Sequence, residues 1–108
     1  MIAPTPDNIT GWVLAGGRAQ RMGGVDKGLQ LFQGQALALR AAQRLASQVH
    51  LVKLNANRHL PDYASWGYDV HDDSLSGYAG PLAGMLTGLQ HCDTEWLLCV
   101  PCDSPFFP

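Results

Sequence analysis

A glycine-rich, basic stretch follows the first apolar segment of the chain. From Trp12 to Gly28 it reads WVLAGGRAQRMGGVDKG. Glycine lacks a Cβ, so its backbone can approach a ligand closely, and successive free N–H groups in such a loop form a concavity that binds anions. Arg18, Arg21 and Lys27 add positive charge, and Arg can bind phosphate through two hydrogen bonds. The sequence therefore predicts a polyphosphate site at the carboxyl end of a first strand, where open α/β sheets bind ligands.

Carboxylate and amide side chains follow three other segments of strand type. Asp103 comes shortly after the last apolar segment, 95–100. Asp73 follows the shorter segment 68–71, and Asn55 follows the segment 49–54. Magnesium prefers one or two carboxylates together with phosphates and water, which makes Asp103 the candidate metal ligand. Asp73 could accept hydrogen bonds from a base edge or from ribose hydroxyls, whereas its neighbour Asp72 is expected to point elsewhere. For Asn55 the alternative is simple turn formation.

The elements that must position these residues alternate between strand and helix. Strands are expected at Thr10–Ala15, Val49–Leu54, Tyr68–His71 and Glu95–Val100, and helices at Ala36–Gln48 and from Pro81 to about His91. Residues Met1 to Asn8 are interpreted as a loose leader, and His59 to Gly67 as irregular or a short helix. Such alternation is typical of an α/β fold with a doubly wound, mostly parallel sheet and flanking helices.

The second helix raises two expectations about packing. Its apolar residues recur at i, i+3, i+4 and i+7, which predicts that Met85 and its apolar neighbours Leu82, Leu86 and Leu89 face the core. Gly84 and Gly88 lie four apart on one face and cost helix stability, about 1 kcal/mol each relative to alanine. Either that face approaches a sheet or a ligand closely, or these are tolerated surface glycines.

Composition and charge exclude several classes of protein. The 108 residues are 46% hydrophobic, and no signal peptide or long apolar run is present, so a cytoplasmic protein is expected. A net charge of −2 gives no reason to expect nucleic-acid binding, and no membrane partner is expected. All seven Lys and Arg lie at or before Arg58, and seven of the nine acids lie after it. This division suits a first part that holds phosphates and a second that helps to hold a divalent cation.

Three cysteines are too few for a zinc site of two pairs and argue against a disulfide framework. Cys99 and Cys102 have the spacing of a redox or metal pair. We interpret them instead as small apolar side chains at the end of a strand.

The loop matches neither the dinucleotide fingerprint nor the P-loop. It resembles the signature L-A-G-G-x-x-x-R-M-G of the nucleotidyltransferases. Its continuation through Asp26, Lys27 and Gly28 is similar to the molybdenum cofactor guanylyltransferases (MobA type), as is the segment Gly80–Gly84. The resemblance implies a Rossmann-like nucleotidyltransferase fold with magnesium as cofactor and Asp103 as its ligand. The nucleotide-binding positions that it implies, together with those added on charge and position, are Leu14, Ala15, Gly16, Gly17, Arg18, Lys27, Asn55 and Asp73. Lys27, Arg21 and Asp103 are the candidate catalytic residues.

In this family the enzyme transfers GMP from GTP to molybdenum-bound molybdopterin and releases pyrophosphate. Molybdoenzymes and cofactor-handling proteins are candidate partners. The resemblance covers only the nucleotide half of the family, so residues 1–108 are interpreted as the GTP-binding part of one domain that lacks the pterin-binding part. Such a fragment should bind GTP but be inactive alone. The alternatives are a related transferase using CTP or a sugar phosphate, and a non-catalytic nucleotide-binding module.

Overall fold

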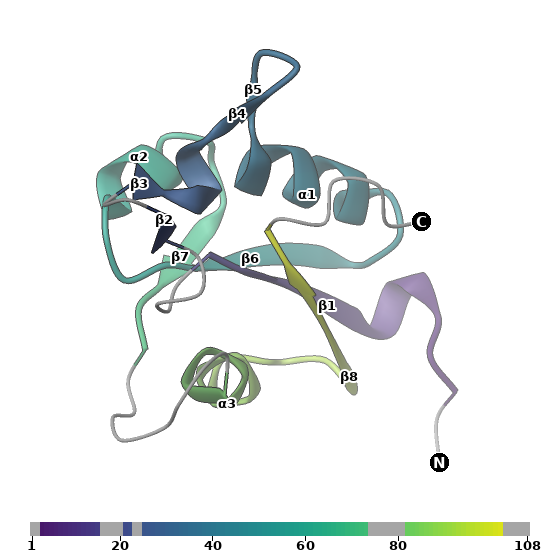
Figure 1. Cartoon of the computed structure of the whole chain (residues 1–108). Helices are drawn as coiled ribbons and strands as arrows, with labels where there is room; N and C mark the ends of the chain where they lie inside the picture. The colour runs from purple at the N-terminus through teal and green to yellow at the C-terminus, as the bar shows by residue number, and fades with distance from the viewer. Residues whose placement is uncertain (1–2, 16–20, 23–24, 74–81, 103–108) are drawn as a thin grey trace.

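A four-stranded sheet forms the centre of the chain in the computed structural model (Figure 1). The structure describes residues 3–15, 21–22, 25–73 and 82–102. For residues 21–22 and 25–27 it describes the backbone alone. The strands of this sheet are β1 (Ile9–Leu14), β6 (Leu51–Asn55), β7 (Asp69–His71) and β8 (Trp96–Pro101). The helices are α1 (Leu37–Ala46), α2 (Leu60–Ala64) and α3 (Leu82–Gln90). Short antiparallel hairpins are formed by β2 (Arg21–Met22) with β3 (Val25–Asp26) and by β4 (Leu31–Phe32) with β5 (Gln35–Ala36).

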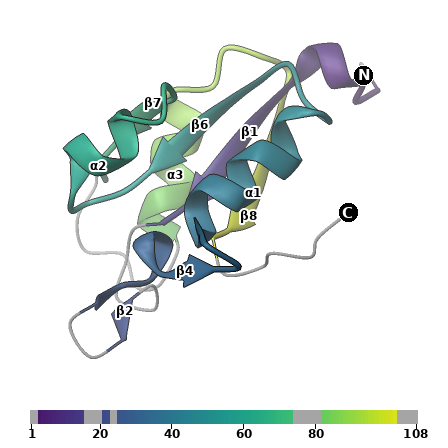
Figure 2. The same ribbon diagram turned by 90° about the horizontal axis from the view of Figure 1, so that it is seen from above.

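The sheet has the strand order β7-β6-β1-β8, and all its pairs are parallel. The central strand β1 pairs with β6 on one side and β8 on the other, with Thr10 opposite both Leu51 and Leu97. Helices α1 and α3 cover opposite faces of the sheet (Figures 1 and 2). This arrangement confirms the predicted doubly wound, parallel α/β fold. Five of the six residues of β1 are buried, as expected for a strand covered on both faces.

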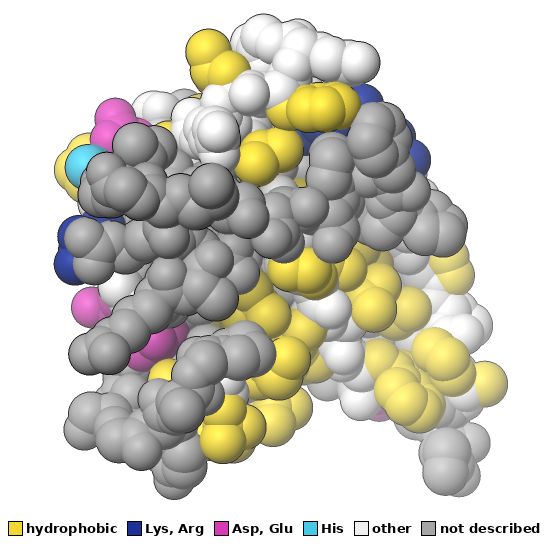
Figure 3. All heavy atoms as spheres, viewed as in Figure 1, with side chains coloured by type: hydrophobic (Ala, Val, Ile, Leu, Met, Phe, Trp, Pro, Cys, Tyr) yellow, Lys and Arg dark blue, Asp and Glu magenta, His cyan; other side chains and the backbone are white. Residues whose placement is uncertain are grey.

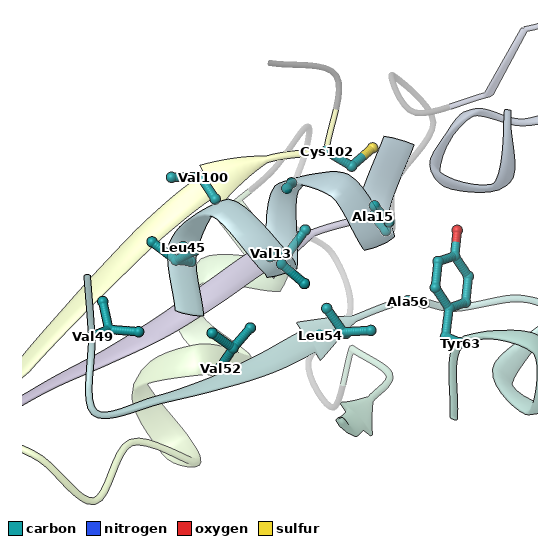
Figure 4. Close-up of a cluster of buried hydrophobic side chains, with 13 residues drawn as sticks. Val13, Ala15, Leu45, Val49, Val52, Leu54, Ala56, Tyr63, Val100 and Cys102 are labelled. Carbon is teal, nitrogen blue, oxygen red and sulfur yellow. The ribbon is translucent and has the colours of Figure 1, made fainter. Parts of the chain in front are cut away.

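The α1 face of the sheet holds the main hydrophobic core (Figure 4). The buried residues of α1 recur with the spacing of an amphipathic helix: Leu37, Ala38, Ala41, Ala42 and Leu45. Leu45 packs so closely on β1 that a Cβ at Gly11 would lie 2.5 Å from Leu45 Cδ2. On the polar side of the helix, the guanidinium of Arg40 lies 5.0 Å from the ring centre of Phe32, an attractive cation–π geometry.

Helix α3 packs on the opposite face through its small residues. Its buried positions are Ala83, Gly84, Thr87 and Gly88, while Leu82, Met85 and Leu89 are exposed. A Cβ at Gly88 would lie 2.9 Å from the indole of Trp12, and Trp12 Nε1 donates a 2.9 Å hydrogen bond to the carbonyl of Gly84. The expectation that Leu82, Met85 and Leu89 face the core is therefore wrong. Leu86 is half-buried. The two glycines bring the helix backbone against the indole, and the large apolar residues occupy the other side.

The exposed apolar residues of α3 belong to a face rich in hydrophobic side chains (Figure 3). Leu82 is 44% exposed and Leu89 is 62% exposed. Leu98 on the edge strand β8 is also exposed. None of the described helices is long and apolar enough to cross a bilayer.

Three stacked rings lie between the sheet and the end of α3. The His71 ring stacks on Trp12 with 5.8 Å between ring centres, and on His91 with 4.0 Å. Lys53 Nζ donates a 2.8 Å hydrogen bond to the His91 carbonyl. Among the described residues, the buried Nε2 of His71 has no hydrogen-bond partner. Burial, followed by His91 and Lys53, lowers the pKa of His71, against a smaller opposite effect of Asp69 and Asp72.

Smaller elements differ in detail from the expectations. The leader contains a 3-10 helix, Pro6–Asn8, in which the Thr5 N–H donates a 2.7 Å hydrogen bond to Asn8 Oδ1. A second 3-10 helix, Lys27–Leu29, precedes strand β4. Gly34 makes the turn between β4 and β5, with φ +80°.

Replacing Gly88 with alanine should destabilise the fold. Alanine favours a helix over glycine by about 1 kcal/mol, but the added methyl would overlap Trp12, and overpacking typically costs about 1–3 kcal/mol. We expect a lower midpoint of thermal unfolding for Gly88→Ala, measured by circular dichroism. Leu89→Ala, at the adjacent exposed position, is the control and should change the midpoint less. A midpoint raised by Gly88→Ala would contradict the close packing.

The stacked histidines should make stability depend on pH. Because the pKa of His71 is lowered in the folded state, the unfolded chain takes up a proton first as the pH falls through the usual histidine range, and the free energy of unfolding decreases. His71→Phe keeps an aromatic ring but cannot titrate. In urea unfolding, the decrease in the free energy of unfolding from pH 7 to pH 5 should be smaller for His71→Phe than for wild type. His50→Gln, at an exposed histidine, is the control. An equal decrease in all three proteins would refute the prediction.

Candidate functional site

The carboxyl ends of the parallel strands bring Leu14, Ala15, Asn55 and Asp73, four of the predicted site residues, to one edge of the sheet. Leu14 ends β1, and the chain on both sides holds it there: the Ala15 N–H donates a 2.8 Å hydrogen bond to the Asn55 carbonyl, and the Cys102 N–H donates a 3.1 Å bond to the Leu14 carbonyl. Leu14 and Ala15 are both buried. The glycine-rich loop therefore begins between the ends of β6 and β8.

This position is a topological switch point. From β1 the chain crosses by α1 to β6 on one side, and the later crossover by α3 leads to β8 on the other side. The crossover by α1 leaves β1 itself, whereas the crossover by α3 leaves β7, so the strand order changes direction at β1. Open α/β sheets bind ligands outside the carboxyl ends of the strands at such a point.

Asn55 and Asp73, predicted separately from sequence, are brought into contact. Asn55 Nδ2 donates a 2.8 Å hydrogen bond to Asp73 Oδ1 and a 3.2 Å bond to the His71 carbonyl. Asn55 is 1% exposed, so an amide that satisfies these acceptors is stabilising there. On its other side, a Cβ at Gly84 would lie 2.5 Å from Asn55 Oδ1, so α3 confines this side chain. Asn55 therefore does more than form a turn, because its side chain links β6, the end of β7 and α3.

Lys27 begins the 3-10 helix Lys27–Leu29, next to the buried Gly28. A Cβ at Gly28 would overlap the hydroxyl of Tyr63 and lie 3.1 Å from the Ala15 Cβ. Tyr63 lies in α2 and is fully buried. The close approach of Tyr63 and Ala15 explains why glycine follows Lys27, and it brings the backbone of this turn to the end of β1. Tyr63 is a residue that sequence reasoning missed, because its contact with Gly28 is made only on folding.

The remaining candidates are described in part or not at all. The backbone of Arg21 pairs with that of Asp26 in the β2–β3 hairpin. Gly16, Gly17, Arg18 and Asp103 lie outside the described residues. Asp103 follows directly on Cys102, whose backbone is bonded to the end of β1. The three cysteines are free, and burial, together with Cys92, raises the pKa of the Cys99 thiol. Within the described residues, His, Cys, Asp and Glu form no group of three that could hold a metal.

Gly28→Ala should disturb the turn that carries Lys27, and Tyr63→Phe should relieve part of the effect. The new methyl competes with the Tyr63 hydroxyl for the same space, so removing that oxygen makes room for it. We expect a lower unfolding midpoint for Gly28→Ala and a midpoint for the double variant that is higher than the sum of the single effects predicts. Additive effects of the two substitutions would contradict a direct clash.

Comparison with known proteins agrees with this arrangement. Residues 11–108 match the family model described as the MobA-like NTP transferase domain. The chain is 61% identical over 101 residues to a protein of Acidovorax sp. (strain JS42) named molybdenum cofactor guanylyltransferase, covering 94% of this chain and 48% of that protein. It is 57% identical over 105 residues to a protein of the same name from Ralstonia nicotianae, covering 97% and 51%.

A solved structure has the same fold. The crystal structure of Rv0371c from Mycobacterium tuberculosis H37Rv superposes with a TM-score of 0.58 at 23% identity, covering 99% of this chain and 56% of that one. The chain spans about half the length of the curated relatives that it matches. On the match to the family model, which begins in β1 and extends to the last residue, this chain belongs to the MobA-like NTP transferase domain family.

Proposed function

We propose that this chain is the nucleotide-binding part of a molybdenum cofactor guanylyltransferase, which transfers GMP from GTP to molybdenum-bound molybdopterin and releases pyrophosphate. The observation that carries the proposal is the convergence of Leu14, Ala15, Asn55, Asp73 and the Lys27 turn at one switch point of the sheet. The names of relatives at 57–61% identity support the choice of reaction. This chain should bind GTP and catalyse little transfer alone.

The proposed roles follow from charge and position. Nucleotidyl transfer builds negative charge on phosphate oxygens, which fixed donors stabilise. The backbone of the loop after Ala15, with Arg18, Arg21 and Lys27, provides such donors. Asn55 and Asp73, which are hydrogen-bonded to each other, are proposed to contact the base or ribose. The acceptor's phosphate is ionised at neutral pH, so this scheme needs no general base.

Magnesium is proposed to bind at Asp103. The donor set suits this ion: a carboxylate follows directly on Cys102, which is anchored beside the end of β1, and the substrate itself brings phosphate oxygens. When bound, magnesium would neutralise charge on the phosphates.

Titration calorimetry with GTP, CTP, ATP and UTP, each with and without magnesium, tests the proposal. We expect selective binding of GTP that weakens without magnesium. Loss of a charge-assisted hydrogen bond in Lys27→Ala should weaken binding about ten- to a hundredfold. Arg44→Ala removes one positive charge from the last turn of α1, away from the proposed site, and is the control.

The other outcomes separate the alternatives. Preference for CTP would indicate the related cytidylyl branch, and binding of GTP without pyrophosphate release, even when the acceptor and a full-length relative's second half are supplied, would indicate a non-catalytic module. A folded chain that binds no nucleotide, or binds equally well after Lys27→Ala, would refute the proposed site.

A further inference from the structure

Two hydrogen bonds join the exposed side chain of Asn57 to Asp73. Its Nδ2 donates a 3.0 Å hydrogen bond to Asp73 Oδ2, and its Oδ1 accepts a 2.7 Å bond from the backbone N–H of Asp73. The partners are 16 residues apart, so this is not the local turn bonding common for asparagine. The side chain is exposed, and burial does not require it to be paired.

Asn57 and Asn55 together donate hydrogen bonds to both oxygens of the Asp73 carboxylate. Asn55 donates to Oδ1 at 2.8 Å, and Asn57 donates to Oδ2 at 3.0 Å. Two donors on two oxygens define the plane of the carboxylate as well as its position. A carboxylate has about four acceptor sites, so about two remain for a ligand after these bonds.

The backbone beneath this carboxylate is tied down as well. The His71 carbonyl accepts hydrogen bonds from the Ala56 N–H at 3.1 Å and from Asn55 Nδ2 at 3.2 Å. Hydrogen bonds therefore join the turn after β6 to the end of β7. Asn57 extends this linkage two residues beyond the end of the strands, to the backbone and side chain of Asp73.

We propose that Asn57 is a positioning residue of the nucleotide site. With Asn55, it presents Asp73 in one orientation to a ligand group that carries two adjacent hydrogen-bond donors. Guanine's N1–H with its N2 amine is one such group, and the ribose 2′,3′-diol is the other. The inference rests on the proposed function, because it requires Asp73 to contact the nucleotide. A carboxylate oriented before binding loses less conformational freedom when the ligand arrives.

Asn8 provides a matched control. It also accepts one hydrogen bond, from the Thr5 N–H at 2.7 Å, and donates one, to the Ala3 carbonyl at 3.0 Å. It lies just before β1 begins, at the opposite edge of the sheet. Asn57→Ala and Asn8→Ala each lose two hydrogen bonds, so comparable changes in unfolding midpoint are expected, and only Asn57→Ala should change nucleotide affinity.

The experiment is a GTP titration of wild type, Asn57→Ala, Asn57→Asp, Asn8→Ala, Asp73→Ala and the Asn57→Ala/Asp73→Ala double variant. We expect about a tenfold loss of affinity for Asn57→Ala, the effect of a typical hydrogen bond. Asn57→Asp should lose at least as much, because it sets a second carboxylate against Asp73. In the Asp73→Ala background, Asn57→Ala should have no further effect, since Asn57 acts through that carboxylate.

Two analogues identify the ligand group. ITP lacks the N2 amine but keeps N1–H, and 2′-deoxy-GTP lacks the 2′-hydroxyl but keeps the 3′-hydroxyl. The analogue that has lost one of the two donors to Asp73 should be less sensitive to Asn57→Ala than GTP is. Equal sensitivity of GTP and both analogues would refute the paired-donor assignment. GTP binding that Asn57→Ala leaves unchanged, or additive effects of the two substitutions, would overturn the inference while leaving the proposed function intact. A folded wild type that binds no nucleotide would overturn both.

Discussion

The hydrogen bonds that β1 makes on both of its sides are the constraint on which the rest of the structure depends. A buried central strand must satisfy every backbone N–H and C=O, and β1 does so by pairing in parallel with β6 and β8. Pairing continues past the strand end through Ala15 and Cys102. Parallel pairing sets the carboxyl ends of β1, β6, β7 and β8 at one edge of the sheet, so the segments that follow these strands all begin there.

The two faces of this sheet are covered by different means. Alanine and leucine side chains of α1 fill the space above β1 and β6, whereas α3 brings its backbone against Trp12 through Gly84 and Gly88. The glycines lower helix propensity, and the contact with a large indole ring offsets that loss. This close approach also places the helix beside Asn55, so the packing of α3 and the orientation of a candidate nucleotide-binding amide are coupled.

The proposed site combines a basic loop with a rigid polar patch. The carboxylate of Asp73 is held by two asparagines, and the turn after Lys27 packs on Ala15 and Tyr63. Catalysis of phosphate transfer depends on groups held in place before reaction. The hydrogen-bonded network of Asn55, Asn57 and Asp73 has this property.

The sequence by itself determined the alternation of strands and helices, the buried face of α1 and the gathering of Asn55 and Asp73 at one edge, because hydrophobic periodicity and strand ends are local features. It indicated a close approach at Gly84 and Gly88 without deciding on its partner. Only the tertiary structure decided that Trp12 is that partner, that Met85 therefore faces outward, and that Asn57 and Tyr63 support the site. These contacts join residues far apart in the chain, and no local pattern specifies which of several possible neighbours will meet.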